Sequence, residues 1–168
     1  MITLYLDMDG VLADFHKAYA KFDTGWDKKK FKQAVMDYKI FEDLEFMPNT
    51  QKLLNHVCRL PVRIEILTSK GTFDPFQGNE AARQKQVWLN KHNLPWKANF
   101  VRCKEEKSQY ATPHSILIDD SIGCITPFEQ KGGHGILHVD ANIDHTIDLL
   151  NKLLLQIPAM DELNGKRS

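Results

Sequence analysis

Short apolar runs alternate with longer stretches of helical periodicity along most of the chain. Apolar runs of this length predict buried strands, and the amphipathic stretches between them predict helices. The predicted strands are Ile2 to Leu6, Val62 to Leu67, Asn99 to Arg102, Ser115 to Ile118 and Ile136 to Val139. We therefore expect an α/β fold with a Rossmann-like parallel sheet core flanked by helices.

Two of the predicted helices have clear boundary signals. Pro48 and Asn49 supply a helix start, and Asn93 ends a later helix. One face of that later helix carries Ala81, Lys85, Trp88, Leu89 and His92. The GTFDPFQGN segment before it, residues 71–79, is predicted to be a loop because of its Gly, Pro and Asn content.

Residues 15–47 do not follow the simple alternation. The stretch has a helical pattern, is rich in aromatic and charged residues, and is too long for an ordinary crossover connection. We predict an α/β core of residues 1–14 and 48–168, with residues 15–47 as a small helical cap insertion after the first strand. The aromatic residues Phe15, Trp26, Phe31, Phe41 and Phe46 are expected to form mostly the insertion's own small core.

Composition and charge exclude several classes of protein. The chain carries 22 basic and 22 acidic side chains, so no net charge draws it to nucleic acid or to a membrane. Its three cysteines are widely spaced, which argues against a disulfide framework or a structural zinc site. No signal peptide or spanning segment is visible, so the expected location is the cytoplasm. We expect a monomer or homodimer with no stable nucleic acid complex.

Polar side chains follow three of the predicted strands. In an open parallel sheet, ligands bind beyond the carboxyl ends of the strands, so these groups are expected to meet in one crevice. They are Asp7 with Asp9, Thr68 with Ser69, and Asp119 with Asp120. Four carboxylates so close together require a bound cation or a retained proton, and oxygen ligands favour Mg²⁺.

A phosphate group could complete such a magnesium site. The hydroxyl of Thr68 and the ammonium of Lys104 or Lys107 would hold its oxygens. Each of these residues also has a structural interpretation, because Asp, Ser and Thr cap helices and the lysines could belong to a solvated turn. The paired acids after two separate apolar strands favour the functional interpretation.

These motifs resemble those of the haloacid dehalogenase (HAD) superfamily, and specifically its phosphatases. The DxDG element at Asp7 to Gly10, Thr68, a downstream lysine and the acidic pair after the fourth strand correspond to its four motifs. Within the superfamily the chain is most similar to the 5'(3')-deoxyribonucleotidases. That similarity lies in DMDGVLADF, FEDLEFMPN, ILTS, RQKQVWLNKH, KSQYA, ILIDDS and FEQKGGHGI.

The resemblance implies a magnesium-dependent phosphomonoester hydrolase that acts through an aspartyl-phosphate intermediate. Asp7 would be the nucleophile, and Asp9 would protonate the departing oxygen and then activate water. To act as an acid near neutral pH, Asp9 needs a pKa above its ordinary value. Phe15, directly after the catalytic loop, is the first candidate for stacking on a nucleobase in the substrate pocket.

The resemblance also implies the groups that bind phosphate and metal. Thr68, the Ser69 amide and Lys107 would bind the phosphoryl group. The metal ligands would be Asp7, the carbonyl of Asp9, and one of Asp119 and Asp120, with Asp120 favoured.

Three functions remain open from the sequence. The first is a nucleotidase acting on a (deoxy)nucleoside monophosphate. The second is a phosphatase of another small ester, such as a sugar phosphate or a nucleic-acid end. The third is a receiver-type signalling domain, which we expect to carry its phosphoacceptor on a central strand rather than at residue 7.

Overall fold

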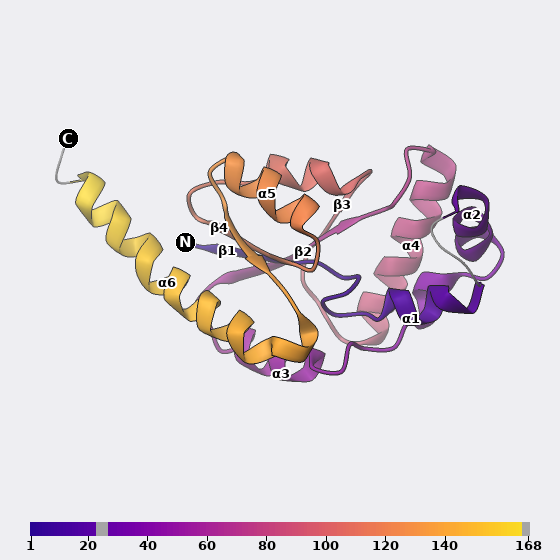
Figure 1. The fold of residues 1–168 in the computed structure, drawn as a ribbon, viewed down its shortest axis with the longest axis horizontal. Coiled ribbons are helices and arrows are strands. Elements are labelled where there is room, and N and C mark those ends of the chain that lie inside the picture. The colour runs from indigo at the N-terminus through magenta and orange to yellow at the C-terminus, as the bar shows by residue number, and fades with distance from the viewer. Residues whose placement is uncertain (23–26, 166–168) are drawn as a thin grey trace.

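A five-stranded parallel sheet lies at the centre of the molecule (Figure 1), and the strand order is β3-β2-β1-β4-β5. The computed structural model describes residues 1–22 and 27–165, with side chains up to residue 158. The strands are β1 (Thr3–Leu6), β2 (Arg63–Ser69), β3 (Ala98–Val101), β4 (Ser115–Asp119) and β5 (His134–Leu137). All four neighbouring pairs are parallel, so the predicted α/β fold is confirmed.

The first strand in the sequence is the central strand of the sheet. β1 pairs with β2 on one side and with β4 on the other. Our criterion against a receiver domain was therefore wrong, because residue 7 does follow a central strand. Strand position alone cannot separate the two classes of protein.

Helices cover both faces of this sheet (Figure 1). Alternate strand residues point to opposite faces: Leu4 and Leu6 pack in one apolar cluster, and Tyr5 packs against another. The helices are α1 (Phe15–Tyr19), α2 (Lys28–Met36), α3 (Thr50–Val57), α4 (Pro75–Lys91), α5 (Ile122–Gln130) and α6 (Ile143–Gly165). The 3-10 turns are η1 (Ala20–Phe22), η2 (Ile40–Asp43), η3 (Lys104–Tyr110) and η4 (Asp140–Asn142).

The helix α4 begins earlier than its sequence suggested. Residues 75–79 were predicted as loop, but they form the first turn of α4. Pro75 fits there because the first helical position needs no N–H donor, and the Asp74 side chain accepts a 2.8 Å hydrogen bond from the Gln77 amide. The other end is as predicted, since Asn93 adopts φ of 54° just beyond the helix.

The stretch 15–47 forms α1, η1, α2 and η2, which lie beside α4 (Figure 1). Its aromatic rings pack on one another, but they belong to the same continuous apolar cluster as β1 and α3. The insertion therefore shares its core with the sheet instead of having one of its own. Trp26 lies outside the described residues, and the domain boundaries stay a prediction.

None of the described helices combines the length and the apolar character that a membrane crossing requires. The cytoplasmic location stays a prediction.

Candidate active site

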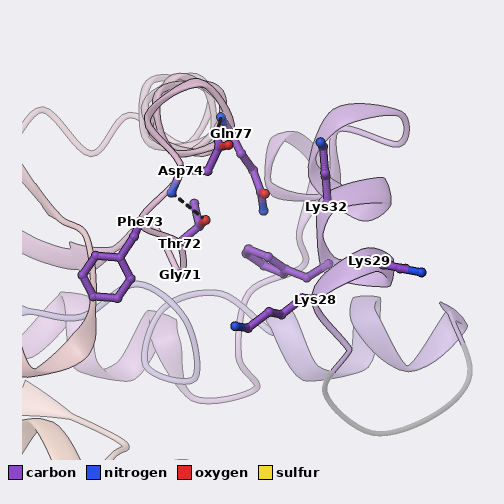
Figure 2. Close-up of a pocket in the computed structure, with 9 residues that line it drawn as sticks. Lys28, Lys29, Lys32, Gly71, Thr72, Phe73, Asp74 and Gln77 are labelled. Atoms are coloured by element: carbon purple, nitrogen blue, oxygen red, sulfur yellow. Dashed lines mark hydrogen bonds between the residues drawn. The ribbon is translucent and has the colours of Figure 1, made fainter.

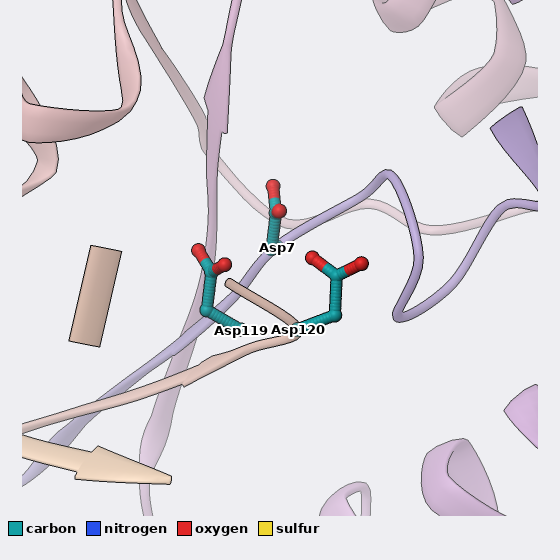
Figure 3. A group of neighbouring side chains, drawn as sticks. All are labelled: Asp7, Asp119 and Asp120. Atoms are coloured by element: carbon teal, nitrogen blue, oxygen red, sulfur yellow. The ribbon is translucent and has the colours of Figure 1, made fainter. Parts of the chain in front are cut away.

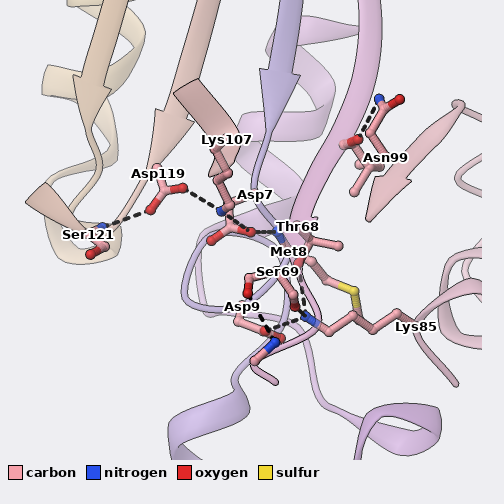
Figure 4. Close-up of polar contacts among 12 residues, drawn as sticks. Asp7, Met8, Asp9, Thr68, Ser69, Lys85, Asn99, Lys107, Asp119 and Ser121 are labelled. Carbon is pink, nitrogen blue, oxygen red and sulfur yellow. Dashed lines mark hydrogen bonds and ion pairs between the residues drawn. The ribbon is translucent and has the colours of Figure 1, made fainter. Parts of the chain in front are cut away.

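The carboxyl ends of β1, β2 and β4 lie level with one another. Leu6 is opposite both Ile66 and Ile118, so the residues that follow these three positions emerge at the same edge. The Asp7 amide donates a 3.0 Å hydrogen bond to the carbonyl of Ile118 across this edge. The strand register alone therefore brings the predicted polar residues together (Figure 4).

Three carboxylates form a compact cluster at this edge (Figure 3). One oxygen from each of Asp7, Asp119 and Asp120 can be chosen so that all lie within 4.8 Å of one another. Asp7 and Asp119 are buried, whereas Asp120 is exposed. Oxygen donors at this spacing suit a hard divalent cation such as Mg²⁺.

The buried residue Lys107 from η3 contacts two of these acids. Its Nζ lies 2.8 Å from Asp7 Oδ1 and 2.6 Å from Asp119 Oδ2. Burial on its own would lower the pKa of Lys107, but the charges of Asp7 and Asp119 raise it above its ordinary value. The alternative candidate, Lys104, is exposed and makes no recorded ion pair with the described acids.

Asp119 and Asp120 differ in how their oxygens are used. Asp119 accepts hydrogen bonds at both oxygens, from the Ser121 amide at 2.9 Å and from Lys107. Asp120 makes no recorded hydrogen bond or ion pair within the described parts of the chain. Of the two, Asp120 therefore has the carboxylate oxygens that are free to bind a cation.

The charge in this cluster is not balanced by protein groups. Burial and the nearby Asp7 raise the pKa of Asp119. The Asp120 side chain reaches solvent, but partial desolvation of its carboxylate, together with Asp7, raises its pKa to about 6. Lys107 opposes both shifts without cancelling them. A site in which carboxylates resist ionisation is one that a divalent cation would stabilise, so the residues present fit Mg²⁺.

Asp9 lies on the other side of Asp7 and pairs with a lysine that the sequence analysis did not select. Lys85 of α4 is fully buried, and its Nζ lies 2.6 Å from Asp9 Oδ2. The same ammonium donates to Thr68 Oγ1 at 2.9 Å and to the carbonyl of Ser69 at 2.7 Å. The available signal was a lysine among the apolar residues of one predicted helix face.

The two oxygens of Asp9 have different surroundings. Oδ2 is held by Lys85, whereas Oδ1 is buried and has no hydrogen-bond partner among the described residues. Burial raises the pKa of Asp9, Lys85 opposes the shift, and Asp7 adds to it. The net direction is upward, as the sequence analysis required of an acid.

The loop after Asp9 is closed by a glycine in the left-handed region. Gly10 has φ of 78°, and its amide donates a 2.9 Å hydrogen bond to the carbonyl of Ala13. A Cβ at position 10 would lie 2.0 Å from Asp120 Oδ2. Glycine is therefore required both for the turn and for the close approach of Asp120.

The aromatic candidate Phe15 is largely buried. Its ring stacks on Tyr19 and on Phe41, with 5.3 Å between ring centroids in each case. A cavity of about 540 Å³ lies between α2 and the loop after β2 (Figure 2), and Phe31 lines it instead of Phe15. Contact between Phe15 and a substrate stays a prediction.

A family comparison covers most of this site. The family model described as "5' nucleotidase, deoxy (Pyrimidine), cytosolic type C protein" matches residues 24–152. The matched stretch includes Thr68, Lys107 and the acidic pair at 119–120. Asp7 and Asp9 lie before it.

The individual proteins similar to this chain share a quarter or less of its residues. A protein of Chlorobaculum tepidum named "Putative 5'(3')-deoxyribonucleotidase" is 24% identical over 158 residues, which cover 78% of this chain and 75% of the relative. The crystal structure of a hydrolase from Streptococcus pneumoniae superposes with a TM-score of 0.53 at 13% identity, over 87% of this chain and 97% of the other. A structure titled as a dehalogenase gives 0.52 at 11% identity, over 80% and 83%. The two structures support the fold.

Proposed function

Because the chain belongs to the deoxy (pyrimidine), cytosolic type C family of 5' nucleotidases, which are HAD-superfamily phosphatases, we propose that it is a magnesium-dependent 5'(3')-deoxyribonucleotidase. Its substrates would be deoxynucleoside monophosphates. The observation that carries this proposal is the convergence of Asp7, Asp119 and Asp120 with Lys107 at the carboxyl edge of the sheet. The name of the relative from Chlorobaculum tepidum supports the substrate class.

The first chemical step is phosphoryl transfer to the protein. An oxygen of the Asp7 carboxylate forms a bond to phosphorus while the bond from phosphorus to the nucleoside oxygen breaks. The electron pair of the broken bond stays on that oxygen, which takes a proton from Asp9. The raised pKa of Asp9 supports this role, because it keeps the carboxyl protonated at higher pH.

The second step is hydrolysis of the aspartyl-phosphate. A water oxygen attacks phosphorus, the bond to Asp7 breaks, and the carboxylate is released. Asp9, now ionised, accepts a proton from the water and is ready for the next cycle. Inorganic phosphate then leaves.

The anionic phosphoryl group is bound by groups of opposite or partial positive charge. Lys107 balances its charge beside Asp7, and Thr68 and the Ser69 amide donate to its oxygens. Asp7, Asp120 and the Asp9 carbonyl would hold Mg²⁺, with Asp119 mainly positioning Lys107. When bound, the ion supplies positive charge against the repulsion between nucleophile and phosphate.

A substrate panel tests the proposal. The purified chain is assayed for phosphate release from deoxynucleoside 5'- and 3'-monophosphates, sugar phosphates and a phosphorylated oligonucleotide end, with Mg²⁺ and with EDTA. We expect repeated turnover of deoxynucleotides only with Mg²⁺. Preference for a sugar phosphate or for the oligonucleotide would replace the substrate class, and a single phosphorylation without turnover would favour a receiver domain.

Asp7→Asn provides the matched variant for this assay. The amide is a poor nucleophile, so we expect a loss of activity of at least about 1,000-fold. Asp148→Asn, an exposed position on α6, should keep wild-type activity. Substantial turnover by Asp7→Asn would contradict the covalent mechanism.

A further inference from the structure

Lys85 is a buried cation that the proposed mechanism does not use. It comes from α4 and belongs to none of the four motifs, yet its ammonium lies between Asp9, Thr68 and the carbonyl of Ser69 (Figure 4). The ring of Phe41 lies against the same ammonium, with 4.6 Å from Nζ to the ring centroid. A buried lysine is unfavourable unless its charge and its donors are satisfied, so these contacts must persist together.

We propose that Lys85 is a positioning residue for the acid and base Asp9. By holding Oδ2 in place, Lys85 directs Oδ1 toward the oxygen of the substrate that leaves phosphorus. The inference rests on the proposed phosphatase function and adds a residue to it.

The contacts of Lys85 fix the carboxylate in one orientation. An ammonium group has three N–H donors, and the three recorded acceptors use all of them. Two of those acceptors, Thr68 and Ser69, belong to the end of β2 and cannot move without the sheet. The Asp9 side chain is therefore tied to a rigid element, although it stands on a turn.

The other oxygen of Asp9 is the one available for chemistry. Oδ1 is buried and has no hydrogen-bond partner among the described residues. Most buried acceptors in folded proteins have a hydrogen-bond partner, and a catalytic role is one explanation for an exception. Oδ2 cannot serve, because Lys85 donates to it at 2.6 Å.

Binding of the phosphoryl group is a weaker explanation for Lys85. All three of its donors already have protein acceptors, so none remains for a substrate oxygen. Lys107 differs in this respect, since only Asp7 and Asp119 are recorded as its partners in the described chain. Lys85 therefore positions the acid Asp9, whereas Lys107 is left to bind the phosphoryl group.

Two substrates with different leaving groups can show whether Lys85 acts by positioning the acid Asp9. A nucleoside oxygen needs a proton as it departs, whereas p-nitrophenolate leaves without one. The ratio kcat/KM reports the steps up to departure, so it excludes the later hydrolysis step. For Lys85→Met we expect kcat/KM to fall at least about 100-fold with a deoxynucleoside monophosphate and less than about 10-fold with p-nitrophenyl phosphate. Equal losses, or no loss, would overturn the proposal.

A matched lysine controls for effects on the helix. Lys91 lies on α4 and is exposed, with an ion pair to Asp43, so Lys91→Met should leave both kcat/KM values unchanged. The inhibition constant of inorganic phosphate should change less than about threefold in Lys85→Met, because Lys85 has no N–H donor left for a phosphate oxygen. A large rise of that constant would assign Lys85 to the phosphate site instead.

Two further variants keep the test decisive if Lys85→Met folds poorly. Lys85→Arg retains the charge, but a planar guanidinium cannot reproduce the three-point arrangement, so the same substrate-dependent loss is expected. In an Asp9→Asn background, a Lys85 substitution should change kcat/KM less than about twofold, because the two residues act as a unit. A further tenfold loss there would contradict action through Asp9. Wild-type protein inactive on both substrates would refute the proposed function itself.

Discussion

At the scale of single residues, Gly10 controls how closely the acidic cluster can assemble. Its left-handed φ turns the chain directly after Asp9, and its missing side chain leaves space for the Asp120 carboxylate. Backbone conformation and metal-site geometry therefore depend on the same position. Gly132 has a similar φ of 88°, but a Cβ there would meet nothing within 4 Å.

Comparing Gly10 with Gly132 separates the effect of backbone strain from the effect of displacing Asp120. Gly10→Ala and Gly132→Ala should each lose about 1 kcal/mol of unfolding free energy from backbone strain. Only Gly10→Ala should also displace Asp120 and lower turnover at least about 100-fold, because positioning of a reacting group by about 1 Å matters that much. Denaturant unfolding and phosphate release measure the two quantities. Normal turnover by Gly10→Ala would show that Asp120 is not needed where it lies.

Sequence reasoning located the acids but not all of their partners. Acids directly after parallel strands must meet at one edge, so Asp7 and Asp119 could be placed from pattern alone. The choice between Lys104 and Lys107 depends on the rotation of η3, which spacing in the sequence does not specify. Lys85 reaches the site only because α4 packs against the strand ends, and such tertiary contacts leave little trace in a single sequence.

At the scale of elements, α4 connects the helical segment of residues 28–43 to the site. Gln84, next to Lys85, is fully buried and donates a 2.7 Å hydrogen bond to the carbonyl of Val35 in α2. Its Oε1 accepts from the Phe41 amide of η2 at 3.3 Å. The Gln84 side chain thus joins α2 and η2 to α4, the helix that carries Lys85.

Loss of the Gln84 side chain should weaken the attachment of α2 and η2 to α4. Gln84→Leu leaves a buried carbonyl and a buried amide without their partner, at about 1–3 kcal/mol each, so we expect a total loss of about 2–6 kcal/mol in unfolding free energy. The control is Gln86→Leu on the same helix, which removes an exposed hydrogen bond to Asn90 and should change stability by less than about 0.5 kcal/mol. Similar effects from both variants would argue against Gln84 as the connection.

The start of α4 shows why element boundaries are hard to predict. Gly, Pro and Asn in residues 71–79 indicated a loop, yet Pro75 and the Asp74 cap are also helix-start signals. Local composition cannot decide between a loop and a helix start when both use the same residues. In the structure these residues form a helix start, with Asp74 as the N-cap and Pro75 in the first turn.

The N-cap hydrogen bond from the Gln77 amide to the Asp74 side chain can be tested on its own. Asp74→Ala removes the acceptor of the Gln77 amide and should lower the unfolding free energy by about 1 kcal/mol. Asp148→Ala, an exposed aspartate on α6, should be close to neutral. Equal unfolding midpoints for wild type and Asp74→Ala in urea would mean that the cap contributes nothing.

At the scale of the whole molecule, the class of fold was readable and the order of strands was not. Alternating strand and helix patterns determine a parallel sheet, because parallel strands need crossover connections. The same alternation is compatible with several orders of strands. Placing β1 between β2 and β4 gathers Asp7, Thr68 and Asp119, which are far apart in the sequence, at one site, and that arrangement depends on long-range packing.

The stability of the whole molecule should respond to pH through the acidic cluster. The pKa values of Asp119 and Asp120 are raised in the folded state, so between about pH 4 and pH 7 the folded protein binds more protons than the unfolded chain. Unfolding free energy of the metal-free protein therefore falls as pH rises through this range. Ionised carboxylates that repel one another cause the loss.

Magnesium should reverse this loss where the carboxylates are ionised. We expect Mg²⁺ to raise the melting temperature more at pH 8 than at pH 5, with a stabilisation of about 2.7 kcal/mol at 100 times its dissociation constant. Asp120→Asn should make the metal-free protein more stable than wild type at pH 8 and remove most of the response to Mg²⁺, whereas Asp148→Asn should change neither. If Mg²⁺ raises the melting temperature equally in wild type and Asp120→Asn, the ion does not bind the Asp120 carboxylate. Loss of a ligand's charge would weaken the binding and so reduce the stabilisation.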